Sequence, residues 1–132
     1  MSASDIQADT LIKAVAGELK KNNAIKKPDW ADNVKSGSHA ERIPADEDFW
    51  FVRCASLLYT LYFKSSGVRR LRHRYGGAKG HTVHRAHHRM AGGKIIRSAL
   101  QQLETAGFVK KEKTGRIITD AGKALLDKAV KA

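Results

Sequence analysis

Acidic residues are scarce in this sequence, which has 13 aspartates and glutamates against 25 lysines and arginines among 132 residues. Between Lys64 and Arg97 there is no acidic residue at all. That stretch nevertheless contains ten basic residues: Lys64, Arg69, Arg70, Arg72, Arg74, Lys79, Arg85, Arg89, Lys94 and Arg97. A formal net charge of +12 destabilises a compact chain, because like charges repel one another unless a polyanion neutralises them. Charge alone therefore favours nucleic acid as the partner.

Cysteine occurs once, as Cys54, which excludes an internal disulfide, a thiolate zinc knuckle and a paired redox motif. No apolar run approaches the roughly 18 residues of a membrane span. The first ten residues lack the basic start and the apolar segment of a signal peptide. We therefore expect a soluble, intracellular protein without a membrane partner.

Hydrophobic periodicity predicts a mainly α-helical protein, and the length of the chain suits one domain over residues 1–132. We expect amphipathic helices at 4–21, 93–107 and 119–132, and a short helix near 28–37. Residues 44–64 are apolar on nearly every face after three acids that suit a helix start, so this helix belongs at the centre of the domain. Residues 108–119 are typical of a β-hairpin, with Gly107 and Thr119 as helix caps on either side.

The stretch "GVRRLRHRYGGAKGHTVHRAHHRMAGG", residues 67–93, contains five of the six histidines and six glycines and shows little periodicity. A loop of this length inside a small domain is usually functional or disordered. We interpret it as a basic arm that becomes ordered on its partner.

Metal binding and catalysis are both disfavoured by this composition. His81, His84, His87 and His88 have helix-compatible spacing, but their basic neighbours would repel a divalent cation. Cys54 lies in the most apolar segment, where a cysteine is usually inert, and no glycine pattern matches a phosphate-binding loop. We therefore predict no enzyme, no metal, no cofactor and no small-molecule substrate.

Phosphate binding explains the arm better. Arginine forks grip phosphate bidentately, glycines let the backbone approach closely, and histidines donate hydrogen bonds or stack on bases. Tyr75 has two interpretations that the sequence leaves open: a ring that stacks on a base, or a ring that pins the arm to the core.

The segment "IRSALQQLETAGFVKKEKTGRIITDAG" resembles the winged-helix pattern, in which a recognition helix runs into a β-hairpin. By that resemblance Arg97, Gln101 and the lysines of the hairpin would form a second contact surface, although a solvated helix face is slightly favoured for Gln101 and Gln102. A winged-helix DNA-binding transcriptional regulator is therefore the alternative function, although no dimerisation helix is apparent.

Several stretches together resemble the small-subunit ribosomal protein family nineteen of eukaryotes and archaea. They are "KPDWADNVKSG", "DEDFWFVRCAS", "RYGG", "AGGKIIRSALQQLETAGFV" and "GRIITDAG", and they span nearly the whole chain in the family's order. In the second stretch this chain has Phe49 where tryptophan is common in the family, with Trp50 one place later.

The resemblance implies a helical domain around a central apolar helix, with a small hairpin. It also implies a place in the head of the small ribosomal subunit, bound to ribosomal RNA beside neighbouring ribosomal proteins, and a part in subunit assembly and RNA maturation. The location would be the cytoplasmic ribosome, and the nucleolus during assembly if the source is eukaryotic. Family positions important for RNA contact map onto Arg53 and Ser56 and onto the basic stretch leading into Lys94 and Arg97.

The residues predicted to bind RNA come from the central helix, the arm, the helix that follows the arm and the hairpin. They are Arg53, Ser56, Arg69, Arg70, Arg72, Arg74, Tyr75, Lys79, His84, Arg85, His87, His88, Arg89, Lys94, Arg97, Lys111, Lys113 and Arg116.

Overall fold

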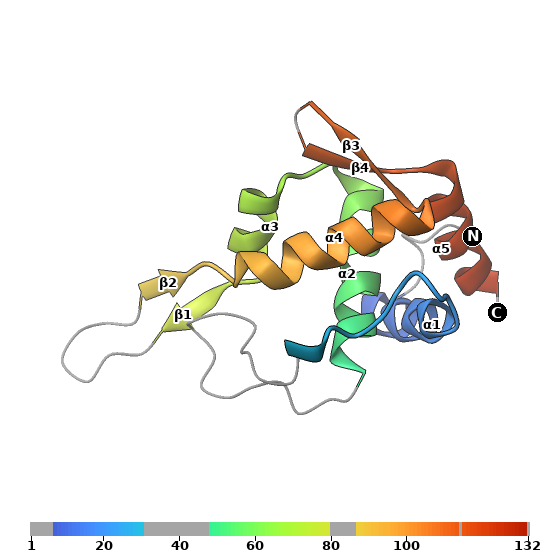
Figure 1. Cartoon of the computed structure of the whole chain (residues 1–132), viewed down its shortest axis with the longest axis horizontal. Coiled ribbons are helices and arrows are strands. Elements are labelled where there is room, and N and C mark those ends of the chain that lie inside the picture. Colours follow the sequence, from blue (N-terminus) through green and yellow to red (C-terminus); the bar gives the residue numbers. More distant parts are fainter. Residues whose placement is uncertain (1–6, 31–47, 80–86, 114, 132) are drawn as a thin grey trace.

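The computed structural model describes residues 7–30, 48–79, 87–113 and 115–131 (Figure 1). These residues contain the helices α1 (Ala8–Lys20), α2 (Phe49–Phe63), α3 (Val68–Arg74), α4 (Gly93–Ala106) and α5 (Asp120–Lys131). They also contain two antiparallel hairpins, β1 (Gly77–Lys79) with β2 (His87–Arg89) and β3 (Val109–Glu112) with β4 (Gly115–Ile118). The predicted mainly α-helical class is confirmed. None of the described helices combines the length and apolar character needed to cross a bilayer.

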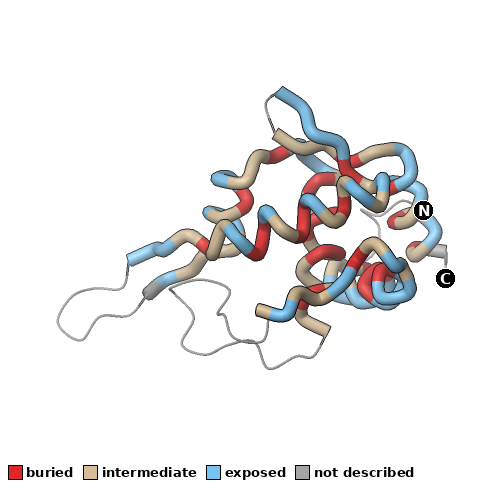
Figure 2. The backbone as a smooth tube through the Cα atoms, viewed as in Figure 1, coloured by how far each residue is buried: buried red, intermediate tan, exposed pale blue. Residues whose placement is uncertain are grey.

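Helix α2 forms the centre of the hydrophobic core, as its apolar sequence predicts. Its buried side chains are Trp50, Cys54, Ala55, Leu57, Leu58 and Leu61. Helices α1, α4 and α5 pack against it, and each buries an apolar stripe while its other side faces solvent (Figure 2). Each leucine or isoleucine buried in this way stabilises the fold by roughly 1.5–3 kcal/mol.

Helix α4 is followed by the hairpin β3–β4 and then by α5, the order that the winged-helix pattern predicts. Gly107 ends α4 in the left-handed region at a φ of 88°, and its amide donates to the carbonyl of Glu104. Thr119 Oγ1 accepts a hydrogen bond from the amide of Gly122 at 3.3 Å and donates to the carbonyl of Gly107 at 2.6 Å. Both predicted caps are therefore confirmed.

The arm differs from the loop that its sequence predicts. Residues 68–74 form α3, and Gly77–Lys79 pair with His87–Arg89 in an antiparallel register. An isolated helix of this length is unstable in water. It is stabilised here because Leu71 is buried and α3 packs against α4. The prediction of an arm without regular structure is wrong for these residues, while residues 80–86 lie outside the described part of the chain.

The start of α3 is joined to the hairpin β3–β4. Ser66 exchanges two backbone hydrogen bonds with Arg116, at 3.2 and 2.9 Å. Gly115 has a φ of 143°, and a Cβ atom there would lie 2.8 Å from the backbone nitrogen of Gly67. Glycine is required at this crossing both for its dihedral angle and for the close approach.

The N-terminal end of α2 lies later than its sequence predicts. The helix begins at Phe49, and the Asp48 side chain makes no capping bond but accepts a hydrogen bond of 2.9 Å from Lys20 Nζ. The other two acids of the predicted helix start, Asp46 and Glu47, lie outside the described residues. Of the helix predicted near 28–37, the described part is a 3₁₀ turn at Asp29 and Trp30.

Candidate nucleic-acid interface

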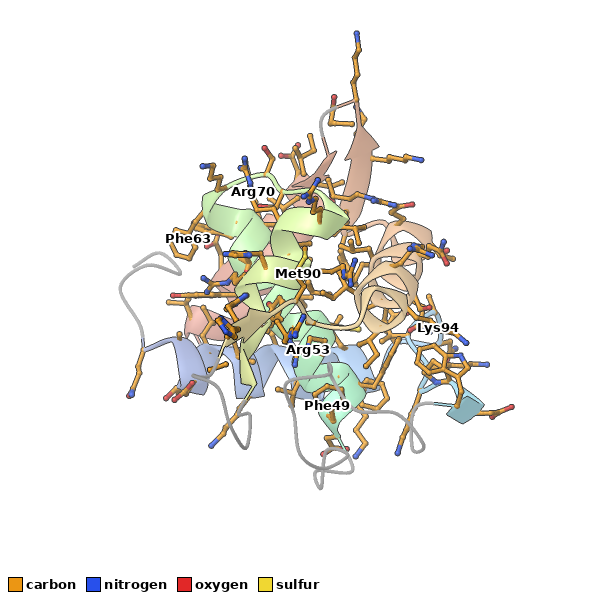
Figure 3. All side chains as sticks on the ribbon, turned by 90° about the vertical axis from the view of Figure 1, so that its left-hand side faces the viewer. Phe49, Arg53, Phe63, Arg70, Met90 and Lys94 are labelled. Carbon is orange, nitrogen blue, oxygen red and sulfur yellow. The ribbon has the colours of Figure 1, made fainter. Side chains whose placement is uncertain are left out.

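One end of the molecule gathers basic side chains from α3, the hairpin β1–β2 and the start of α4 (Figure 3). We call residues 64–79 and 87–97 the basic face. Its exposed cations include Lys64, Arg69, Arg70, Arg74, Arg89, Lys94 and Arg97. Within the described residues the ion pairs lie elsewhere, at Lys20–Asp48, Lys21–Glu18, Lys110–Glu112 and Arg116–Glu104. The arginines of the basic face are therefore not neutralised by any described carboxylate.

Arg72 connects α3 to the segment before α4. Its Nε donates to the carbonyl of Ala91 at 2.8 Å, and the amide of Ala91 donates back to the carbonyl of Arg72 at 2.8 Å. A Cβ atom on Gly93 would lie 3.3 Å from Arg72 Cδ, which is tight packing. Arg72 thus stabilises the basic face from within.

Tyr75 lies at the C-terminal end of α3 and contacts α2. Its hydroxyl shares a hydrogen bond of 2.6 Å with the Ser56 hydroxyl and one of 3.3 Å with Thr60 Oγ1. Of the two interpretations of Tyr75, the structure supports the ring that pins the arm to the core. Ser56, which was predicted to bind RNA, is the hydrogen-bond partner of the Tyr75 hydroxyl.

Arg53 lies between two aromatic rings. Its guanidinium carbon is 4.1 Å from the ring centroid of Tyr75 and 5.1 Å from that of Phe49, and Figure 3 shows Arg53 beside Phe49. Burial lowers the pKa of Arg53, while Tyr75 and Cys54 act in the opposite direction. Cation–π attraction offsets part of the desolvation cost. Phe49 thus holds the arginine, whereas the neighbouring Trp50 enters the core at 1% exposure.

The histidines that the structure describes lie on α3 and β2. The rings of His73 and His88 are 4.4 Å apart between centroids and tilted by 39°. His87 is exposed and pairs in the hairpin register with Lys79. His81, His84 and Arg85 lie outside the described residues. Among the residues that are described, no three histidine, cysteine or acidic side chains come together as a metal-binding group.

One flank of α4 is contacted by residues 26–30, which follow α1. Gln102 Oε1 accepts from Trp50 Nε1 at 2.9 Å and from the amide of Lys26 at 3.1 Å, and Gln102 Nε2 donates to the Lys26 carbonyl at 2.8 Å. Lys94 Nζ lies 4.5 Å from the ring centroid of Trp30. Gln102 is therefore a structural residue and not part of a solvated face, whereas Arg97 and Gln101 are exposed.

The predicted contact residues of the hairpin β3–β4 are of two kinds, exposed lysines and an arginine that is already paired. Lys111 and Lys113 are exposed. Arg116 Nε donates to Glu104 Oε1 at 2.8 Å, and 13% of the Arg116 side chain is exposed. Arg116 therefore holds the hairpin against α4, and its charge is already paired.

Cys54 is fully buried in α2, and burial raises the pKa of its thiol to about 12. The thiolate is the nucleophilic form of cysteine, so a raised pKa disfavours reactivity at neutral pH. The core position predicted for Cys54 is confirmed.

Two adjoining hollows lie beside the C-terminal end of α2, and the smaller one is lined by Phe63, a residue that the sequence did not single out. The larger, of about 650 Å³, is lined by Lys64, Ser65, Ser66, Gly67, Arg69, Arg70, His73 and Met90. The smaller, of about 450 Å³, shares Lys64, Ser66 and Arg70 with it and adds Phe63 among others. Phe63 is the last residue of the apolar run of α2 and directly precedes Lys64. An aromatic residue next to the first cation of the acid-free stretch is visible in the sequence and could have identified Phe63 as a candidate.

The fold and this face define a small, basic, mainly helical protein with a dense group of exposed cations at one end, the pattern of nucleic-acid-binding proteins. The family model described as "Ribosomal protein S19e" matches residues 2–132. The chain belongs to this family, which confirms the resemblance inferred from its motifs. The family is one of structural ribosomal components, so the prediction that the chain is not an enzyme is confirmed.

Proteins from archaea and from a eukaryote are similar to this chain. "Small ribosomal subunit protein eS19" of Aeropyrum pernix is 44% identical over 131 residues, covering 96% of this chain and 86% of the relative. The protein of the same name from Haloarcula marismortui is 43% identical and covers 93% of this chain and 84% of the relative. "Small ribosomal subunit protein eS19G" of Ascaris suum is 38% identical, covering 96% and 88% respectively.

Proposed function

We propose that this chain is a structural constituent of the small ribosomal subunit and that its basic face binds ribosomal RNA. In line with the family resemblance, we assign it to the head of the subunit, beside neighbouring ribosomal proteins, with a part in subunit assembly and maturation of the RNA. Its location would be the cytoplasmic ribosome, preceded in a eukaryotic cell by the nucleolus. The names of the relatives support the subunit, and the unpaired arginines of the basic face support RNA as the ligand.

The proposed contacts fall into two groups. Direct phosphate contacts are proposed for the exposed cations Arg69, Arg70, Arg74, Arg89, Lys94, Arg97, Lys111 and Lys113, together with Lys79, Arg85 and the histidines His84, His87 and His88. Guanidinium and ammonium groups without a carboxylate partner are free to form charge-assisted bonds to phosphate. Arg53, Ser56, Arg72, Tyr75 and Arg116 are only partly exposed and are held by interactions within the protein, so we propose that they act mainly by holding the basic face in shape.

The DNA-binding regulator is the weaker alternative. A recognition helix enters the major groove and must be free along its exposed side. Here residues 26–30 lie against α4 through Gln102 and Lys94. The strongest concentration of unpaired charge is on α3 and the hairpin β1–β2, outside the winged-helix pattern.

The proposal is tested by sedimentation of a lysate from the source organism through a sucrose gradient, with the chain followed by mass spectrometry. We expect stoichiometric presence with the small subunit that survives a moderate salt wash. Recovery of the chain on DNA, or free at the top of the gradient, would contradict the proposal and favour the regulator.

A further inference from the structure

A hollow of about 450 Å³ lies between the C-terminal end of α2 and α3. Its walls are Tyr59, Thr60, Phe63, Lys64, Ser66, Arg70, Leu71 and Arg74. Small-ligand pockets in proteins span roughly 300–1,000 Å³. The hollow is therefore large enough to receive one ring system from a partner, and its walls combine aromatic with cationic side chains.

Phe63 is the aromatic wall of this hollow. It is 52% exposed, which is unusual for so large an apolar side chain. The ring is held by edge contacts to Tyr59 and Tyr62, at centroid distances of 4.9 and 5.3 Å and interplanar angles of 70° and 76°. An exposed ring whose orientation is already restrained loses little conformational freedom on binding.

Three of the other side chains that line the hollow are cations, Lys64, Arg70 and Arg74. Arg74 Nε donates to Thr60 Oγ1 at 3.2 Å, which orients its guanidinium along the wall. Arg70 also lines the neighbouring hollow of about 650 Å³, so it stands between the two. Figure 3 shows Phe63 and Arg70 on the same side of the basic face. No described carboxylate pairs with Lys64, Arg70 or Arg74.

An aromatic ring beside unpaired arginines matches the chemistry of an unstacked nucleotide. Bases that leave a helix stack on aromatic side chains or guanidinium planes, while basic groups hold the flanking phosphates. An apolar side chain of a partner protein would use the ring but leave the three cations without a counter-charge. Charge complementarity therefore favours RNA as the occupant.

We propose that this hollow binds one unpaired, extruded nucleotide of an RNA, with its base on the Phe63 ring and its flanking phosphates at Arg70 and Lys64. The inference deepens the proposed function and rests on it, because the RNA that supplies the nucleotide is the one bound by the basic face. A fully paired RNA helix has no base to place in the hollow, so the site confers preference for an irregular RNA over a regular duplex.

The test uses the full chain and two RNA probes, a fully paired duplex and the same duplex with one bulged 2-aminopurine. Fluorescence anisotropy gives the Kd for each probe at one fixed salt concentration. We expect the wild-type chain to prefer the bulged probe and to quench its 2-aminopurine. Phe63→Ala should weaken binding of the bulged probe by about tenfold, with the paired probe unchanged, since an aromatic stack on a base carries an effect of this order.

Three further variants sharpen the result. Phe63→Trp should keep the preference and the quenching, because it retains a stacking ring. Arg70→Ala should weaken binding of both probes, whereas Lys128→Ala, on α5 at the far end of the molecule in Figure 1, should weaken neither. If Phe63→Ala and the wild type bind the bulged probe with equal affinity, the nucleotide site is overturned. The proposed function is still supported in that case as long as the chain binds the duplex. Failure of the wild-type chain to bind either RNA overturns the proposed function itself.

Discussion

At the scale of single residues, Arg53 shows how a charge can be tolerated near the core. It has two ring contacts, to Tyr75 and Phe49, and Tyr75 is held in turn by the Ser56 hydroxyl. A guanidinium is more weakly hydrated than an ammonium and stacks well on aromatic faces. These residues therefore act as a unit that connects α2 with the end of α3.

We predict that Arg53→Ala lowers the free energy of unfolding by about 1–3 kcal/mol, because it removes a partly desolvated cation–π contact and leaves a gap between two rings. Incorporation into small subunits should fall further than for Arg69→Ala, whose side chain is exposed. Arg53→Lys keeps the charge but loses the planar stack, so its incorporation should lie between those of Arg53→Ala and Arg69→Ala. Urea unfolding and gradient fractions measure the effects, and incorporation of Arg53→Ala at the wild-type level would refute the prediction.

Cys54 leads to a prediction about alkaline pH. Burial raises its pKa from an ordinary 9.0 to about 12, so between these values the unfolded chain releases the proton while the folded chain retains it. The unfolded state then binds fewer protons, and stability falls with rising pH by up to about 1.4 kcal/mol for each pH unit. Cys54→Ala should lose this contribution. Urea unfolding at about pH 7 and about pH 10 should show that the variant loses less free energy of unfolding over this interval than the wild type does. Equal losses in the two proteins would contradict the prediction.

At the scale of elements, the hairpin β1–β2 depends on a close approach just before its first strand. A Cβ atom on Gly76 would collide with the carbonyl oxygen of Arg89, at the end of β2. The hairpin is exposed along β2 and contributes little to the core. Its geometry is therefore separable from the stability of the rest of the chain.

We predict that Gly76→Ala displaces the hairpin and weakens RNA binding by about three- to tenfold, the loss expected for one or two phosphate contacts. Its thermal unfolding should change little. Gly17→Ala is the matched control, since a Cβ atom there meets nothing within 4 Å in the middle of α1. That variant should raise stability by about 0.5–1 kcal/mol and leave RNA affinity unchanged. Wild-type affinity in Gly76→Ala would show that the hairpin does not contact RNA.

At the scale of the whole molecule, the charge is distributed asymmetrically. The basic face gathers cations at one end, while the described ion pairs lie on α1, the start of α2, and α4 with the hairpin β3–β4. Such an arrangement orients the molecule toward a polyanion before contact is made.

We predict that RNA affinity falls steeply with salt, because each phosphate contact releases a counterion. Arg69→Ala should reduce the slope of log K against log salt concentration by about 1, and Lys128→Ala on α5 should leave it unchanged. Titrations over a range of salt concentrations measure both slopes. An affinity that does not change with salt would rule out phosphate contact as the basis of binding.

The sequence predicted most of the fold because periodicity reports which face of a helix is buried. Periodicity predicted the buried stripes of α1 and α4 and the apolar helix α2. Residue type predicted the caps Gly107 and Thr119 and the hairpin β3–β4. The seven-residue helix α3 was missed, although Val68, Leu71 and Tyr75 have helical spacing, because a single turn or two of pattern is weak without knowledge of its partner.

The site was predictable in its charge but not in its internal partners. The acid-free stretch 64–97 located the basic face. Nothing local indicated that Arg116 pairs with Glu104 or that Gln102 binds Trp50 and Lys26. Those contacts join residues far apart in the chain, so they depend on how the helices pack.

The amino-acid sequence by itself determined that the protein is basic and mainly helical, that Cys54 is core, and that its motifs are those of the ribosomal protein S19e family. Composition and periodicity are local properties, and they survive without coordinates. Only the tertiary structure decided which cations have carboxylate partners, that Tyr75 pins α3 to α2, and that Phe63 faces a hollow lined by Arg70 and Arg74. The physical reason is that pairing and burial depend on distances between segments that are remote in sequence.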